Sequence, residues 1–307
     1  MTDRKVRGAV SFSSRVKSEL CRAPLSRGCC ARAEVYGALL YANTFSFREI
    51  KIITGSAEFA HRLPRLFRRV FGMDFDASSV PSSGARAVFS VTSPEKIASV
   101  FERYGYDARS TLVHHINLGV LEDECCRRAF ARGVFLAGGS VADPSGRCHL
   151  ELVTEHTSVA RELLALLREM GFEPKQSARG AHRIIYFKQS EAIEDFLGAI
   201  GATTSAMELM SAKVEKDMRN AVNRRVNCDS ANADKIVSAA QAQLEKIRAI
   251  ERGVGIENLP EDLQQAAILR IANPEASLAD LALLSSPPVS KSCINHRLRK
   301  LMSYEVE

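Results

Sequence analysis

Long apolar runs are missing from this sequence of 307 residues, and residues 1–28 contain no stretch of the kind that a signal peptide or a membrane helix needs. We therefore expect a cytoplasmic protein without a membrane partner. The sequence also lacks the spaced cysteine framework of a small secreted domain, because its eight cysteines include two adjacent pairs, Cys29-Cys30 and Cys125-Cys126. Such cysteine usage indicates a reducing compartment.

The composition supplies enough apolar material for a folded core. Hydrophobic residues make up 46% of the chain and charged residues 25%, over a length that suits about two domains. Lysine and arginine total 42 against 36 acidic residues, a formal net charge of +6. The excess is concentrated in a basic N-terminal segment, residues 1–28, which carries Arg4, Lys5, Arg7, Arg15, Lys17, Arg22 and Arg27. This uneven charge suits a polyanionic partner such as DNA.

The sequence repeats itself once, over about residues 29–106 and 125–202. Cys29 to Leu40 aligns without gaps on Cys125 to Leu136, and six of the aligned positions are identical. Weaker matches continue through the rest of both segments. An internal duplication is the simplest explanation, and it predicts one duplicated domain over residues 29–204.

Each repeat is predicted to contain a helix, two strands, a second helix, a third strand and a third helix. In the second repeat the helices fall at 126–137, 159–170 and 190–200 and the strands at 149–153 and 183–187. Ser190 is the expected N-cap of the last helix. The order α-β-β-α-β-α predicts the α+β class with a mainly antiparallel sheet. Two such units usually pack about a pseudo-twofold axis, where Gly37 and Gly133 would let their helices cross closely.

The first helix of each repeat resembles the signature helix of LAGLIDADG homing endonucleases. The matching segments are Gly133-Val134-Phe135-Leu136-Ala137-Gly138-Gly139 and, in more degraded form, Gly37-Ala38-Leu39-Leu40-Tyr41-Ala42-Asn43. In those nucleases each helix ends near an acidic residue that binds a divalent metal and activates water. Ala42 and Gly138 stand at these positions and cannot bind a metal. The resemblance therefore implies the nuclease fold without its catalysis and predicts no catalytic or metal-binding residue.

Asp143 follows the second signature helix and is the obvious substitute for the missing acid. It begins the segment Asp143-Pro144-Ser145-Gly146, whose composition is typical of a tight turn. We therefore interpret Asp143 as a turn residue.

Residues 205–252 are predicted to form a helical linker of two helices, broken near Asn227-Cys228-Asp229. The first helix is expected to bury an apolar stripe made of Met207, Met210, Val214, Met218 and Val222. Its outer face carries Arg219, Arg224 and Arg225, which are candidates for phosphate contacts. The alternative is an ordinary solvated face.

Residues 253–307 have the layout of a helix-turn-helix domain. After glycines at 253 and 255, a helix is expected at 261–271, a short helix capped by Ser277 with Leu278, Leu281 and Leu284 inward, a turn at 285–288, and a last helix capped by Ser290. Ile294, Leu298 and Leu301 form the buried stripe of that helix. The second helix of such a motif enters the major groove of DNA.

The polar side of the last helix carries the candidate DNA-reading residues. The candidates for base contacts are Ser290, Lys291, Ser292, Asn295, His296 and Arg299, and those for phosphate contacts are Arg297 and Lys300. An asparagine pairs with adenine through two hydrogen bonds, and arginine or lysine binds the acceptors of guanine. The alternative is a protein-docking module, because three-helix domains serve both purposes.

Taken together, the sequence resembles the WhiA family over almost all of its length. The motifs that carry the resemblance are Ser11-Phe12-Ser13-Ser14, Val16-Lys17, Glu19-Leu20, Cys125-Cys126-Arg127-Arg128-Ala129-Phe130, Phe135-Leu136-Ala137-Gly138-Gly139-Ser140-Val141, His149-Leu150-Glu151, Arg219-Asn220, Asn223-Arg224, Asn227-Cys228, Ser290-Lys291-Ser292 and Asn295-His296-Arg297-Leu298-Arg299-Lys300. The family implies a degenerate LAGLIDADG-like domain joined to a sigma-region-4-like helix-turn-helix. Its members are nucleoid-associated transcription regulators of sporulation and cell division rather than nucleases. The implied partners are promoter DNA, RNA polymerase holoenzyme and a WhiB-type iron–sulfur protein.

Two other functions are compatible with parts of the sequence. An active DNA endonuclease would need the acids that Ala42 and Gly138 replace, and a transcriptional adaptor would act through a protein or a ligand instead of DNA. The two cysteine pairs also suggest a four-thiolate zinc or iron–sulfur site. Adjacent cysteines are poor chelators of one ion, however, so we expect small buried side chains and no cofactor.

Overall fold

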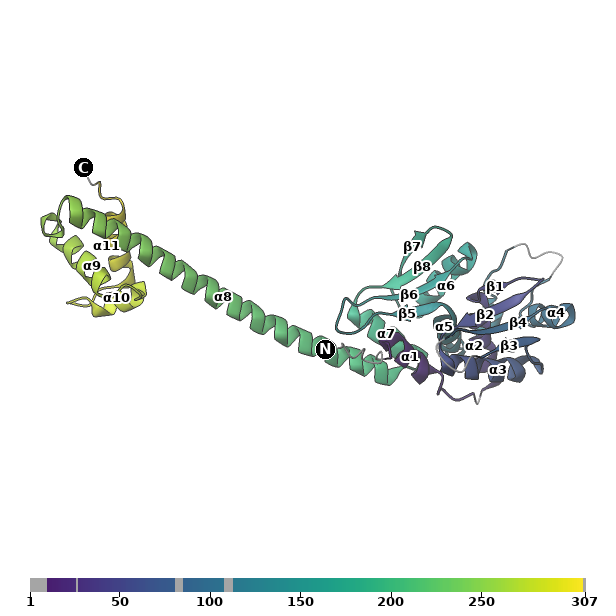
Figure 1. Cartoon of the computed structure of the whole chain (residues 1–307). Coiled ribbons are helices and arrows are strands. Elements are labelled where there is room, and N and C mark those ends of the chain that lie inside the picture. The colour runs from purple at the N-terminus through teal and green to yellow at the C-terminus, as the bar shows by residue number, and fades with distance from the viewer. Residues whose placement is uncertain (1–9, 26, 81–84, 108–112, 306–307) are drawn as a thin grey trace, which may run out of the picture. The chain divides into compact units, whose positions relative to one another are not determined.

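The structure, a computed structural model, describes residues 10–25, 27–80, 85–107 and 113–305 (Figure 1). Arg4, Lys5 and Arg7 of the basic N-terminal segment therefore lie outside the described residues. The chain divides into two compact units, residues 1–217 and 218–307. None of the helices in the described residues combines the length and the apolar character needed to span a membrane.

The first unit contains two copies of one arrangement, preceded by α1 (Phe12–Leu20) and joined by the short 3-10 helix η1 (Leu118–Val120). The first copy comprises α2 (Gly28–Leu40), β1 (Thr44–Phe45), β2 (Ile50–Thr54), α3 (Ala57–Phe71), β3 (Ala77–Ser79), β4 (Ala87–Val91) and α4 (Pro94–Arg103). The second comprises α5 (Glu124–Gly138), β5 (Gly139–Val141), β6 (Leu150–Thr154), α6 (Thr157–Glu169), β7 (Lys175–Arg179), β8 (His182–Phe187) and α7 (Ser190–Ile200).

Each copy builds one four-stranded antiparallel sheet. The strand orders are β1-β2-β4-β3 and β5-β6-β8-β7, so the two sheets have the same topology. In the central strands β2 and β6, successive residues alternate between a buried and a half-buried face. The α+β class, the antiparallel sheets and the duplication are confirmed.

The expected order α-β-β-α-β-α is wrong by one strand in each copy, because β3 and β7 were missed. Every residue of both strands is exposed, and β7 is the polar segment Lys175–Arg179. An edge strand of this kind has no buried face and therefore no apolar alternation to detect. It forms because its backbone pairs with β4 or β8, which the sequence pattern does not encode.

Helices α2 and α5 cross at two glycines, as predicted. A Cβ atom at Gly37 would lie 2.2 Å from the carbonyl oxygen of Phe130, and one at Gly133 would lie 1.9 Å from that of Glu34. Figure 1 shows these two helices side by side between the sheets of the first unit. The crossing of the backbones joins the two copies into one hydrophobic core.

Two local predictions in the second copy have opposite outcomes. The turn at Asp143 is confirmed, since Gly146 N donates to Asp143 O at 3.0 Å and Asp143 Oδ1 accepts from the backbone N and the Oγ of Ser145. The predicted N-cap Ser190 is wrong, because Gln189 occupies that position. Ser190 begins the helix instead and its Oγ donates to the buried Glu194 carboxylate at 2.6 Å.

The second unit contains most of the long helix α8 (Thr203–Gly253), the 3-10 helix η2 (Ile256–Asn258), α9 (Glu261–Ala272), α10 (Leu278–Leu284) and α11 (Lys291–Met302). Its own core joins Ile247 and Ile250 of α8 to Leu263, Leu281 and Leu298 of the three helices that follow. The predicted all-α C-terminal region is therefore confirmed.

Both predictions about α8 itself are wrong. The helix has no break near Asn227, because it contains no proline, and its single glycine is its last residue. Asparagine and aspartate lower helix propensity by only a few tenths of a kcal/mol, roughly, which does not stop a helix. The stripe expected to be buried is exposed, with Val214 at 57% and Met218 at 58%. Ala206 and Leu209 are buried in place of Met207 and Met210, so a neighbouring face of the first turns joins the core.

Candidate nucleic-acid interface

Helix α10 is started by a reciprocal cap. Ser277 Oγ accepts from the backbone N of Asp280 at 3.2 Å, and Asp280 Oδ2 accepts from the backbone N of Ser277 at 3.1 Å. The predicted cap is therefore confirmed, and Leu281 is fully buried. The inward placement predicted for Leu284 is wrong, since this last residue of the short helix is 55% exposed.

Ser285 holds the turn between α10 and α11. Its Oγ donates to Ala282 O at 2.8 Å and accepts from the backbone N of Val289 at 3.1 Å. Val289 N also donates to Ala282 O at 3.0 Å. The two prolines between these residues have no N–H to donate, so the serine hydroxyl closes the turn that the sequence predicted at 285–288.

Helix α11 begins and buries its apolar stripe as predicted. Ser290 Oγ accepts from the backbone N of Cys293 at 3.2 Å, which caps the helix. Ile294, Leu298 and Leu301 are each 1% exposed and lie in the core of the second unit. The opposite face is thereby turned outward.

The outward face of α11 brings the candidate base-reading residues together. Lys291, Asn295 and Arg299 follow one another at intervals of four residues, a spacing that places side chains on one side of a helix. Of all the candidates, Ser290, Lys291, Ser292, His296, Arg299 and Lys300 are exposed and Asn295 and Arg297 are half-buried. Within the part of the chain that the structure describes, no carboxylate forms an ion pair with a basic residue of α11. The cations of this face are therefore available to a polyanion.

Arg270 is a structural residue of this unit that the sequence reasoning missed. It lies in the last turn of α9, is only 2% exposed, and donates from Nη1 to Ala276 O at 2.7 Å and to Asn273 O at 3.4 Å. Burial lowers the pKa of its guanidinium. The side chain thus holds the loop that leads into α10. Nothing in the sequence distinguishes it from an exposed arginine in a last helical turn, where a basic residue is common.

The phosphate-contact candidates Arg219, Arg224 and Arg225 lie exposed on α8. The helix rises about 1.5 Å per residue, so Arg225 is about 33 Å along the axis from Ile247, where α8 enters the core of the second unit. The structure does not bring them to α11.

The basic N-terminal segment is partly used inside the first unit. Lys17 Nζ donates to Leu136 O at 3.1 Å, and burial lowers the pKa of this amine to about 8. Arg15 forms an ion pair with Glu208. These two residues anchor α1, so they add little to any DNA-facing charge.

At the ends of the two signature helices, α2 and α5, the position of Gly138 has no room for an acidic side chain. Ala42 comes after Tyr41, the C-cap of α2, and Gly138 is the last residue of α5. A Cβ atom at Gly138 would lie 2.6 Å from the Tyr41 ring and 2.7 Å from Val153 O. Tyr41 is itself buried, and burial raises the pKa of its hydroxyl well above the usual range. An aromatic ring therefore lies against the end of α5, at the position where the sequence resemblance would place an acid.

One set of metal-ligand side chains does converge elsewhere in the first unit. Cys29, Cys30, Cys125 and Cys126 form a group of four close side chains that could bind a metal ion, and the described residues contain no other group of three or more histidine, cysteine or acidic side chains of this kind. Three of these cysteines are half-buried and Cys126 is buried, so the expectation of small buried side chains is met in full only at Cys126.

Comparisons with known proteins cover nearly the whole chain. Residues 127–219 match the model of the WhiA LAGLIDADG-like domain, and residues 222–304 match that of the WhiA C-terminal HTH domain. The chain is 39% identical to the probable cell division protein WhiA of Ruminiclostridium cellulolyticum, over 95% of this chain and 96% of the relative. It is 37% identical to the protein of the same name from Heliobacterium modesticaldum, over 96% and 95%.

A solved structure supports the same fold. The crystal structure of full-length DUF199/WhiA from Thermatoga maritima superposes with a TM-score of 0.59 at 24% identity, covering 96% of this chain and 97% of that chain. The duplicated unit and the helix-turn-helix seen in the structure fall in the residues that match the two family domains, and the sequence match to the relatives covers almost the whole chain. The chain therefore belongs to the WhiA family, which combines a LAGLIDADG-like domain with a C-terminal helix-turn-helix domain.

Proposed function

We propose that this chain is a non-catalytic transcription regulator that recognises promoter DNA by sequence through α11. The observation that carries the proposal is the outward face of that helix, where Lys291, Asn295 and Arg299 lie in one line and form no ion pair with a carboxylate of the described residues. The names of the relatives at 39% and 37% identity suggest cell-division genes as targets, and the family resemblance adds sporulation genes.

The mechanism follows from how the face is built. The capped N-terminus of α11 would enter the major groove, where Asn295 can accept from and donate to adenine. Lys291 and Arg299 would bind the O6 and N7 acceptors of guanine, while Arg297 and Lys300 would contact phosphates and fix the register. Ser290, Ser292 and His296 would add hydrogen bonds at the edge of the same surface.

The assignment as a non-catalytic protein rests on the ends of the signature helices. Alanine and glycine replace both acids, and Tyr41 and Val153 leave no space for a side chain at Gly138. Phosphodiester hydrolysis by this fold needs hard oxygen ligands for a divalent metal at these places. Magnesium-dependent nicking that persists through rigorous purification and is lost on substitution within this chain would overturn the assignment.

Partners beyond DNA are expected from the family resemblance alone. They are RNA polymerase holoenzyme and a WhiB-type iron–sulfur protein. If regulation by a variant that no longer binds DNA stayed intact, the adaptor function would replace the one proposed here.

The test is a binding comparison on specific and random DNA. Asn295→Ala or Arg299→Ala is expected to weaken binding to a specific promoter fragment by about 1–3 kcal/mol, or about 5- to 150-fold, because base contacts are lost. Arg224→Ala on α8 serves as the control. It is expected to weaken binding to the promoter fragment and to random DNA by the same factor. Gel-shift titrations over a salt series measure both. Equal losses on random DNA for the α11 variants would contradict base reading by this helix.

A further inference from the structure

The two adjacent cysteine pairs meet across the crossing of the repeat-related helices. Cys29 and Cys30 lie in the first turn of α2, and Cys125 and Cys126 lie in the first turn of α5, at equivalent positions of the two copies. Their four Sγ atoms all lie within 4.8 Å of one another. All four are free thiols in the structure. A close group of thiols contributed by two separate helices is a ligand set for a soft or borderline metal ion.

The distances fit one ion better than a cluster. Four sulfurs around a tetrahedral ion at about 2.3 Å stand about 3.8 Å apart. The Sγ atoms of Cys29 and Cys30 are 4.0 Å apart, so adjacency in the sequence does not keep this pair from sharing an ion. In a four-iron cluster each thiolate binds a different iron, and the thiolates therefore stand further apart than around a single ion.

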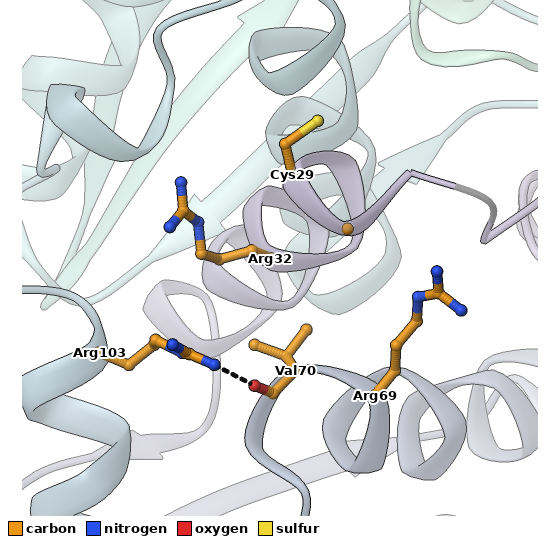
Figure 2. A pocket seen from close by; sticks show the side chains of 6 residues that line it. Cys29, Arg32, Arg69, Val70 and Arg103 are labelled. Carbon is orange, nitrogen blue, oxygen red and sulfur yellow. Dashed lines mark hydrogen bonds between the residues drawn. The ribbon is translucent and has the colours of Figure 1, made fainter.

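The surroundings can compensate the charge of such a site. Four thiolates and one divalent ion carry a net charge of −2, and the N-termini of α2 and α5 present partial positive charge to it. The side chain of Arg27, just before α2, contacts the Cys125 thiol. A pocket of about 450 Å³ beside Cys29 is lined by three further arginines, Arg32, Arg69 and Arg103 (Figure 2). The positive charge of these arginines would offset part of the negative charge of the occupied site.

We propose that Cys29, Cys30, Cys125 and Cys126 bind one tetrahedral transition-metal ion, with zinc as the expected ion. Each thiol releases its proton to solvent when the ion binds, and four sulfur–metal bonds form without any change of oxidation state. Four protein ligands leave no open position, which is typical of a structural site. The ion would hold the first turns of α2 and α5 together and so join the two copies at one end of their crossing. This proposal replaces the expectation that the protein has no cofactor.

The test uses the full-length protein, purified anaerobically with a thiol reductant. We expect about one zinc per chain by elemental analysis. Replacing zinc with Co²⁺ should give thiolate-to-cobalt charge-transfer absorption and the intense visible bands of tetrahedral cobalt. Cys29→Ser and Cys126→Ser should lose the stoichiometric metal and this spectrum. Cys228→Ser, at an exposed cysteine on α8, is the matched control and should retain both.

The wild-type chain keeps the test decisive if a cysteine variant does not fold. Chelation of its metal should lower the unfolding temperature, and added zinc should restore it. Full-length protein that lacks stoichiometric metal and gives no thiolate–cobalt absorption would overturn the proposal. Disulfides among these four cysteines under reducing conditions would overturn it, and so would acid-labile sulfide, which indicates a cluster. A Cys228→Ser variant that loses the metal would also contradict the assigned ligands.

Discussion

At the scale of single residues, a buried carboxylate in the first unit is held by two arginines. Glu34 on α2 is 2% exposed, and its two oxygens accept from Arg62 Nε at 2.6 Å and Nη2 at 2.9 Å. Arg132 on α5 adds a third contact, from Nε to Glu34 Oε2 at 3.2 Å. Arg62 also donates to two backbone carbonyls after α1. One carboxylate therefore links both copies to the N-terminal helix.

Removal of this carboxylate should be strongly destabilising. Glu34→Ala leaves Arg62 buried without its partner, and loss of one member of a buried pair costs about 3–5 kcal/mol. Asp74→Ala, which breaks an exposed pair with Arg68, is the control and should cost below about 1 kcal/mol. Chemical denaturation of the full chain measures both changes. Equal effects of the two substitutions would show that burial does not set the strength of these pairs.

Asp76 gives a second residue-scale prediction, on acid stability. Its carboxylate accepts from Lys96 Nζ, from the backbone N of Thr92 at 2.7 Å and from the backbone N of Ser93 at 2.8 Å. The bond from Lys96 has the largest effect, and together the three bonds lower the pKa of Asp76 from 3.8 to about 2. A lowered folded-state pKa stabilises the protein fully above about pH 4, and this contribution is lost as the pH falls toward 2. The difference in unfolding free energy between wild type and Asp76→Asn should therefore be largest near neutrality and shrink below pH 4. A difference that stays constant down to pH 2 would contradict this.

At the scale of elements, two glycines allow the close approach of helices α2 and α5. The sequence predicted the close crossing of α2 and α5 because small residues recur at matching positions of the repeat. It also predicted α9, α10 and α11 and the serine caps of α10 and α11, since capping residues and apolar spacing are local signals. It missed β3 and β7 because an edge strand without a buried face has no such signal.

The crossing supports a matched pair of substitutions. Gly133→Ala should destabilise the chain by at least about 2 kcal/mol, because the new Cβ would lie 1.9 Å from Glu34 O, a backbone atom that cannot move freely. Gly198→Ala in α7 is the control, since no atom lies within 4 Å of its Cβ position, and it should be neutral or stabilise by up to about 1 kcal/mol. Thermal unfolding followed by circular dichroism compares the two. A tolerated alanine at 133 would mean that the helices are further apart than in this structure.

At the scale of the whole molecule, the two units have separate cores. All buried residues of the first core lie at or before Leu209, and the second core begins at Ile247. Among the described residues, the core of the helix-turn-helix is made of side chains from the second unit, and each unit can be tested for its own share of DNA binding.

A truncated chain tests this division. Residues 1–217 keep the first unit whole and remove the entire helix-turn-helix unit. We expect this fragment to lose the specific promoter complex and the steep salt dependence expected of the full-length chain, because the cations of α11 are gone. Gel shifts of both proteins across a salt series measure it. Specific binding retained by 1–217 would mean that the duplicated unit reads DNA and that the residues assigned on α11 are wrong.

The duplication, the α+β class, the caps of α10 and α11 and the family were predictable from the sequence, because each depends on local spacing or on direct similarity. The folded chain was needed to show which face of α8 is buried, that Arg270 and Glu34 lie inside, and that the four cysteines meet. These features depend on contacts between residues far apart in the chain, such as Cys29 and Cys125. The periodicity of one segment carries no information on its distance from another segment. The distance between the two cysteine pairs is set by the crossing of the two glycine-containing helices.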